Sequence, residues 1–314
     1  MSDHLNSNPV GPELMREFIK EKRSAKRWKN TRFFLLFALI FGLILICFAS
    51  SNMVTLGPGA DKGYVAFIKL NGMIEPGREF SAETVLPQLK DAFSDQNAKG
   101  VVIDINSGGG TPVQASIIHD AIINLKKQYH KKVVVVGEDM MASGAYFVAV
   151  AGDKIYVNPN TITGSIGVIM KGFGFPDVIK KLGVERRVYT SGINKDRLDP
   201  FLPQNQQDVE KIRTVISEIH DNFNQVVLEG RKGKLRADPK ELFSGDFWSG
   251  QTALKLGLVD GLGNLTDVLQ KEFHVSRYRD YSGSSGLLRP FMSQFGMALS
   301  AALNDDELKV LEKI

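Results

Sequence analysis

The chain has 314 residues, of which 43% are hydrophobic and 24% charged, a balance typical of a folded globular protein. Its net charge of +4 comes from the N-terminus, because residues 1–32 carry eight Lys/Arg and four Asp/Glu while the remainder carries 31 residues of each sign. A neutral body argues against nucleic-acid binding. The sequence also has no clustered Cys, His and carboxylate pattern, so we expect neither a metal nor a cofactor.

An apolar segment follows this basic arm, and no charged residue occurs between Arg32 and Asp61. Eighteen apolar residues at 1.5 Å each nearly span a hydrocarbon core of about 30 Å, so we predict a transmembrane anchor over residues 33–52. The positive-inside rule then places residues 1–32 in the cytoplasm and the body outside. A cleaved signal peptide is the alternative, but the leader is too long for its n-region. The single cysteine, Cys47, lies in the anchor, so the body has no disulfide.

Beyond a linker over residues 53–63, apolar runs of strand length alternate with segments of helical periodicity. Strands are expected over residues 64–70, 100–105, 133–137 and 154–157. Helices are expected over residues 81–93 and after the capping-box spacing Thr111–Gln114, with Pro112 at the first helical position. This alternation predicts an α/β domain over residues 64–275 with a largely parallel sheet.

The second half of this domain has a less regular pattern. Residues 161–168 are glycine-punctuated and β-like, and Gly230 follows the longest apolar helical stripe. We expect helices over residues 175–182, 203–229, 254–258 and 265–273, a strand over 184–190 and a loop over 191–196. Residues 276–314 form a C-terminal extension whose role the pattern does not assign.

Ser143 lies among small and apolar residues, shortly after a strand of four consecutive valines. A strand that turns at once into a helix beginning Ala-Ser-Gly-Ala would hold this serine at a sharp corner. Its oxygen would then be exposed, with the next amide N–H directed at the group that it attacks. The alternative is a serine that only caps the helix, which is the commoner role. Ser143 is therefore a candidate nucleophile, with a structural cap as the competing interpretation.

A glycine turn, Gly108–Gly110, follows the preceding strand and can share one crevice with Ser143. Its backbone N–H groups could form an oxyanion or anion site, or the turn could be structural only. It lacks the Lys-Ser/Thr of a nucleotide P-loop and the spacing of dinucleotide-binding folds. Nucleotide binding is therefore disfavoured.

A nucleophilic serine needs a base, and none of the five histidines stands with a carboxylate in a triad context. Lys195, in the polar loop over residues 191–196, is the other candidate. A solvated lysine has a pKa near 10.4, so a lysine base needs burial, with hydroxyl acceptors such as Ser165 nearby. From spacing alone, a surface lysine is the simpler interpretation.

The region from Tyr64 to Leu269 resembles the signal peptide peptidase A (protease IV) family of serine–lysine membrane peptidases, in its short single-copy form. The motifs that carry the resemblance are Asn106–Gly110, Met141–Tyr146, Thr163–Val168, Ser191–Asp196 and Gly245–Gly250 with Gly257–Asp260. Two positions depart from the family pattern. Gly108 replaces the usual Pro, and Asp246 stands where Arg is common.

This resemblance implies a crotonase-like (ClpP-related) α/β fold behind the N-terminal anchor. It implies that Ser143 is the nucleophile and Lys195 the general base. It further implies that the amides of Gly109 and Gly144 form the oxyanion hole and that Ser165 helps to orient the lysine.

The implied function is that of a serine endopeptidase that hydrolyses remnant signal peptides and other apolar, extended peptides through an acyl-enzyme. It would be a single-pass protein of the bacterial inner membrane with its catalytic domain outside the cytoplasm. Short forms assemble into homo-oligomeric rings, in which the serine and lysine can come from neighbouring subunits. Two alternatives stay open: a catalytically silent membrane scaffold, and an acyl-thioester enzyme on the same frame.

Overall fold

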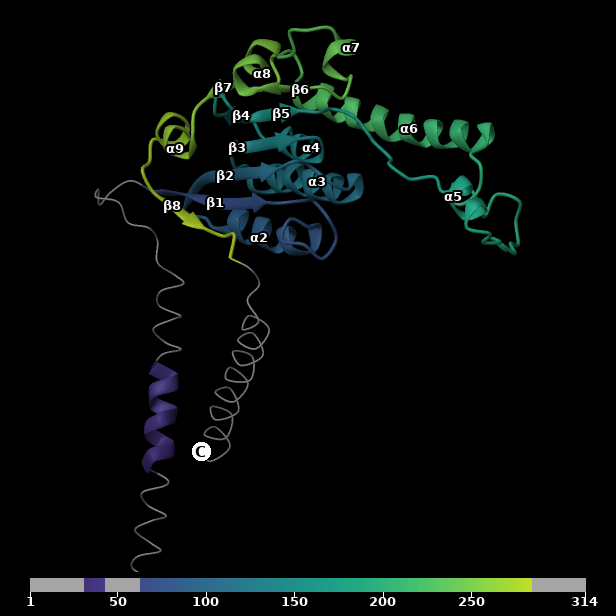
Figure 1. Cartoon of the computed structure of the whole chain (residues 1–314). Helices are drawn as coiled ribbons and strands as arrows, with labels where there is room; N and C mark the ends of the chain where they lie inside the picture. The colour runs from purple at the N-terminus through teal and green to yellow at the C-terminus, as the bar shows by residue number, and fades with distance from the viewer. Residues whose placement is uncertain (1–30, 43–62, 284–314) are drawn as a thin grey trace, which may run out of the picture. The chain divides into compact units, whose positions relative to one another are not determined.

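The computed structural model describes residues 31–42 and 63–283 (Figure 1). The chain divides into two compact units, of which the first contains residues 31–42 and the second residues 63–283. Residues 31–42 are helical, and their side chains are exposed. Within the described residues, no helix is both long and apolar enough to cross a membrane. The rest of the predicted anchor, residues 43–52, lies outside the described residues, as do most of the basic arm, the linker up to residue 62 and residues 284–314.

Residues 63–283 contain a sheet of eight strands, and all of its pairings are parallel except that of β5 with β6. This confirms the predicted α/β class with a mainly parallel sheet. The strands in sheet order are β6 (Phe247–Ser249), β5 (Ile162–Gly164), β3 (Val133–Ala142), β2 (Ala98–Ser107), β1 (Tyr64–Asn71) and β8 (Tyr278–Asp280). β4 (Lys154–Val157) pairs with β3 and with β7 (Gly261–Leu262).

Helices cover both faces of the sheet, and alternation along each strand builds a core under each layer. On β2, Val101 and Ile103 contribute to the larger core while Val102 contributes to the smaller one. The larger core lies under α2 (Ala82–Ser94), α3 (Pro112–Tyr129) and α4 (Gly144–Ala149), and the smaller under α9 (Leu265–Phe273). The remaining helices are α5 (Pro176–Lys181), α6 (Gln206–Gly230), α7 (Pro239–Leu242) and α8 (Gly250–Leu256).

The predicted helix starts are correct at two places and wrong in one detail. Ser81 caps α2 by accepting from the Thr84 N–H, and Pro112 opens α3. The capping box at Thr111 does not form. Instead, the Thr111 hydroxyl donates to the Ile74 carbonyl at 3.3 Å, and the Gln114 side chain accepts from the Ala82 N–H at 2.8 Å. Tertiary partners for both side chains outweigh the local cap.

The strand predicted over residues 184–190 is wrong. These residues contain no strand, and each of them is exposed. They belong to a segment that leaves the body after β5, passes through α5 and returns along α6 (Figure 1). A β-like pattern needs a neighbouring strand to complete its hydrogen bonds, and residues 184–190 pair with no strand among residues 63–283. We call residues 168–205 the projecting segment.

Candidate active site

The ends of β2 and β3 bring the glycine turn and Ser143 into contact. A Cβ atom on Gly109 would lie 2.8 Å from the Ser143 Cβ and 2.8 Å from the Gly144 nitrogen. Gly109 also has φ +102°, a conformation that L side chains rarely adopt. Only glycine fits at this position, because the two turns touch through their main chains. The structure therefore places three predicted site residues, Gly109, Ser143 and Gly144, side by side.

Ser143 has φ 53° and ψ −125°, a backbone conformation that costs free energy for any residue other than glycine. Two main-chain hydrogen bonds hold it there. Its N–H donates to the Gly164 carbonyl at 2.8 Å, and its carbonyl accepts from the Phe147 N–H at 3.0 Å. The Ser143 side chain makes no capping hydrogen bond to α4 and is partly exposed. The capping alternative is therefore wrong, and the hydroxyl stands at a strained corner between strand and helix.

Main-chain N–H groups surround this corner. Gly144 is the first residue of α4, so its N–H has no partner within the helix. The Gly109 N–H donates to the buried Ser107 hydroxyl at 3.1 Å, so an oxyanion would have to compete with Ser107 for this donor. Sequence reasoning missed this role of Ser107. The assignment of Gly109 to the oxyanion hole stays a prediction.

Ser165 occupies the equivalent place on the neighbouring strand. Ala142 pairs with Gly164 in the ladder between β3 and β5, so Ser143 and Ser165 follow paired residues. Ser165 also has a positive φ, 50°, and its N–H donates to the Asp246 carbonyl at 2.7 Å. Asp246 holds Ser165 through its main-chain carbonyl. This contact therefore does not depend on the side chain at position 246, where Arg is common in the family.

A cavity of about 110 Å³ opens beside Ser143, and most of the side chains that line it are apolar. They come from α3, α4 and α6 and from the chain after β5, and include Pro112, Ala115, Phe147, Val168, Ile219 and Phe223. Sequence reasoning missed the contribution of α6, although its apolar stripe was visible. The cavity suits an apolar side chain next to the bond that Ser143 would attack.

Lys195 lies on the projecting segment, in the loop between α5 and α6. Its side chain is exposed, and it is not one of the residues that line the cavity beside Ser143. Its N–H donates to the Gly192 carbonyl at 3.1 Å. The structure therefore groups four of the predicted site residues and places Lys195 on a separate part of the chain. Among residues 31–42 and 63–283, no group of three or more His, Cys, Asp or Glu is arranged to hold a metal.

A strained serine between a parallel strand and a helix, beside main-chain amides, is typical of enzymes that use a serine nucleophile. The chain belongs to peptidase family S49, whose family model matches residues 125–274. A protein of Enterococcus faecium provisionally named signal peptide peptidase SppA is 31% identical over 233 residues, which cover 71% of this chain and 67% of that protein. A provisionally named protease of Synechocystis is 33% identical over 211 residues, covering 66% and 72%.

A different name belongs to a longer relative. The Na⁺/H⁺ antiporter NhaA of Brucella melitensis is 46% identical over 214 residues, which cover 67% of this chain but 29% of that protein. This chain therefore spans less than a third of that relative, and most of the protein named as an antiporter lies outside the matched region.

Proposed function

We propose that this protein is a membrane-anchored serine endopeptidase that uses a Ser143–Lys195 dyad. The Ser143 hydroxyl attacks a peptide carbonyl and transfers its proton to the neutral Lys195 amine. The amine leaving group departs with a proton from Lys195, and water then hydrolyses the acyl-enzyme. The substrates are remnant signal peptides and other apolar, extended segments near the bilayer. The anchor over residues 33–52 holds the catalytic domain outside the cytoplasm.

One observation carries this proposal: the Ser143 hydroxyl makes no capping bond at its strained corner and adjoins an apolar cavity. Backbone strain at a serine is rarely retained without a function, and Ser143 directly precedes Gly144, whose N–H has no partner within α4. The cavity supports an apolar residue next to the scissile bond. The protease names of the Enterococcus and Synechocystis relatives support the same chemistry.

Lys195 reaches Ser143 from a neighbouring copy of the chain in this proposal. Its exposed loop lies outside the cavity of its own Ser143, on a segment rich in exposed apolar side chains. Docking that segment on a neighbour would bury it and remove water from the amine, and loss of hydration favours the neutral form that a base requires. The resulting assembly is a homo-oligomeric ring.

Labelling with a fluorophosphonate tests the nucleophile and the base in the full-length protein. The wild type should be labelled at Ser143, and Ser143→Ala and Lys195→Ala should not. Lys171→Ala, another lysine of the projecting segment, is the matched control and should be labelled like the wild type. An inert Ser143 in folded protein would contradict the proposal and favour a silent scaffold. Turnover of acyl-CoA but not of peptides would favour the thioester enzyme.

Co-expression of Ser143→Ala with Lys195→Ala tests whether the dyad is shared between subunits. Half of the subunits then carry Ser143 and half of their neighbours carry Lys195, so about a quarter of wild-type labelling should return in a closed ring. Each variant expressed alone is the control. A mixture that stays unlabelled would show that the serine and its base belong to one chain.

A further inference from the structure

The helix that carries the candidate nucleophile is only six residues long and fully buried. A helix this short has little stability of its own, so its orientation depends on tertiary contacts. Tyr146, three residues after Ser143, is 0% exposed, and its hydroxyl donates to the Leu258 carbonyl at 2.7 Å. The polar end of α4's largest buried side chain is thus fixed to a turn far along the sequence.

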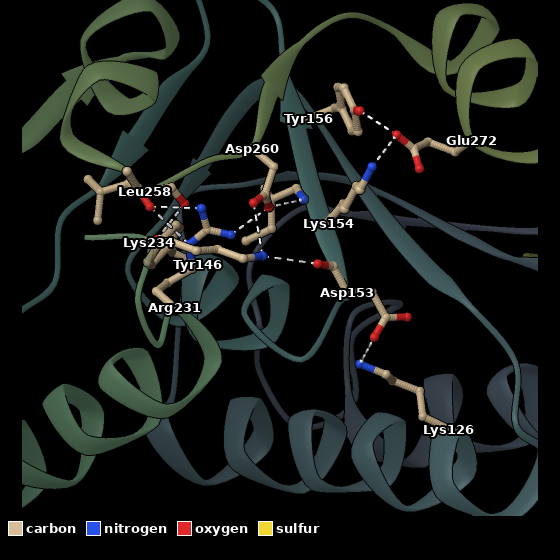
Figure 2. A network of polar contacts seen from close by, with 12 residues as sticks. Lys126, Tyr146, Asp153, Lys154, Tyr156, Arg231, Lys234, Leu258, Asp260 and Glu272 are labelled. Atoms are coloured by element: carbon tan, nitrogen blue, oxygen red, sulfur yellow. Dashed lines mark hydrogen bonds and ion pairs between the residues drawn. The ribbon is translucent and has the colours of Figure 1, made fainter. Parts of the chain in front are cut away.

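That turn, residues 257–260, is held at both ends by Arg231 (Figure 2). The guanidinium donates from Nε and Nη2 to the Gly257 carbonyl, at 3.0 and 2.7 Å, and from Nη1 to the Asp260 carboxylate at 2.5 Å. Arg231 is only 2% exposed. A buried cation is tolerated only when its donors are paired, so this geometry is strongly constrained.

The Asp260 carboxylate ties the same turn to the sheet. It accepts from the Ile155 N–H at 2.8 Å and from Lys234 Nζ at 2.9 Å. Burial alone would raise the pKa of Asp260, but the hydrogen bonds from Arg231 and Lys234 outweigh it and hold the pKa below its usual range. The carboxylate therefore stays charged at neutral pH.

Arg231 is the first residue after α6, so it also connects α6 to α4. α6 packs along α4 at two further points. The rings of Phe223 and Phe147 lie 5.1 Å apart, and a Cβ atom on Gly230 would lie 2.5 Å from the Val150 carbonyl oxygen. The end of α6, the 257–260 turn and α4 are thus joined to one another by both hydrogen bonds and apolar packing.

We infer that Arg231, Asp260 and Tyr146 form a positioning clamp that fixes the orientation of α4 and so aims the Ser143 hydroxyl. This rests on the proposed nucleophilic role of Ser143. Reacting groups must be held within about 0.5 Å of their productive geometry, and a misplacement of about 1 Å can cost 100-fold in rate. The clamp residues do not touch substrate, so their effect falls on the chemical step and not on substrate binding.

Tyr146→Phe tests the clamp by removing one hydroxyl and leaving the ring in place. Tyr156→Phe on β4 is the matched control, because the Tyr156 hydroxyl donates to Glu272 at 2.5 Å and lies outside the path to α4 (Figure 2). In the full-length protein, Tyr146→Phe should lower kcat and the fluorophosphonate labelling rate about tenfold with KM unchanged. Tyr156→Phe should leave all three within about twofold. Asp260→Asn should act in the same direction as Tyr146→Phe.

Hydrogen exchange provides a readout that does not require activity. Amides of residues 144–150 should exchange faster in Tyr146→Phe and at the wild-type rate in Tyr156→Phe. Equal labelling rates in wild type and Tyr146→Phe, or equal losses in both variants, would overturn the clamp. A wild type that is not labelled at all would instead refute the proposed nucleophile, and unchanged exchange in Tyr146→Phe would still refute the clamp.

Discussion

The α/β body and the projecting segment handle apolar side chains in opposite ways. In the body, valines and isoleucines of β1, β2 and β3 are almost completely buried on both faces of the sheet. In the projecting segment, twelve large apolar side chains between Ile169 and Leu202 are exposed, including Tyr189 at 90% and Ile193 at 95%. Exposed apolar side chains that gather into a patch usually mark a contact with another molecule.

The projecting segment is nevertheless ordered by local contacts. The ring of Phe175 lies 5.7 Å from that of Phe201, and Arg186 lies over Phe201 while its guanidinium donates to Asp199. These contacts shape the segment without covering its apolar surface. The body buries its apolar side chains in its own core, while the projecting segment leaves them exposed, and in our proposal a second copy of the chain covers them.

The largest effect is expected in the body, from Gly109→Ala. The new Cβ would lie 2.8 Å from both the Gly144 nitrogen and the Ser143 Cβ, so the corner must shift. Loss of one oxyanion donor typically costs at least about 100-fold in kcat, and we expect a comparable fall in fluorophosphonate labelling. Assembly should be unchanged, since the projecting segment is untouched.

Gly77→Ala is the control for Gly109→Ala. Gly77 also has a positive φ, +76°, but no atom of the described residues lies within 4 Å of its Cβ position. An Ala at this position is also strained by its positive φ but has no contact with Ser143, so the variant should be labelled within about twofold of the wild type. Equal losses in the two variants would show that strain, and not the position of Gly109, limits the activity.

A smaller effect is expected in the projecting segment, from Tyr189→Ser combined with Ile193→Ser. Both side chains are almost fully exposed in the single chain, so their loss should not destabilise it. If they contact a neighbouring copy, the oligomer should dissociate and labelling of Ser143 should fall about tenfold. Light scattering of the detergent-solubilised protein measures the mass, and the same sample measures the labelling.

Ile117→Ser on α3, an exposed apolar residue of the body, is the control for this double variant. It should keep the wild-type mass and labelling. A double variant that also keeps its mass would show that the apolar surface of the projecting segment serves something other than self-assembly.

The same division explains how much could be predicted from the sequence. Regular patterns in the body predicted β4 (Lys154–Val157) and α9 (Leu265–Phe273) with their correct bounds, because burial enforces their periodicity. The pattern over residues 184–190 failed, since alternation without a neighbouring strand does not make a sheet. Local sequence cannot reveal whether a partner strand is present.

The candidate site shows the same limit to local reasoning. The corner at Ser143 and the glycine turn could be predicted, because small residues after a buried strand impose local geometry. The contribution of α6 to the cavity beside Ser143 could not be predicted, and neither could the buried Arg231–Asp260 ion pair. Both depend on which distant segments of the chain lie together. The relation of Lys195 to Ser143 depends on a neighbouring molecule in our proposal, and no pattern within one chain encodes that distance.

A buried carboxyl group in the body, on the sheet face under α9, should affect stability and not activity. Asp104 on β2 is 4% exposed, and its Oδ1 atom has no hydrogen-bond partner among the described residues. Nearby, Lys69 pairs with Glu138 at 2.9 Å. Burial, and then repulsion from the Glu138 charge, raise the pKa of Asp104 to about 7, while Lys69 opposes the shift. The folded body therefore holds a proton that the unfolded chain releases.

Asp104→Asn should remove the resulting pH dependence of stability. An unfolded Asp has a pKa near 3.9, so the wild type is favoured below about pH 4 and loses this contribution as the pH rises through about 7. At pH 8 the variant should be more stable by up to about 4 kcal/mol, while at pH 4 the two proteins should be alike. Urea unfolding followed by Trp248 fluorescence measures this, with the exposed Asp280→Asn as control. Equal pH slopes in wild type and Asp104→Asn would contradict the assignment.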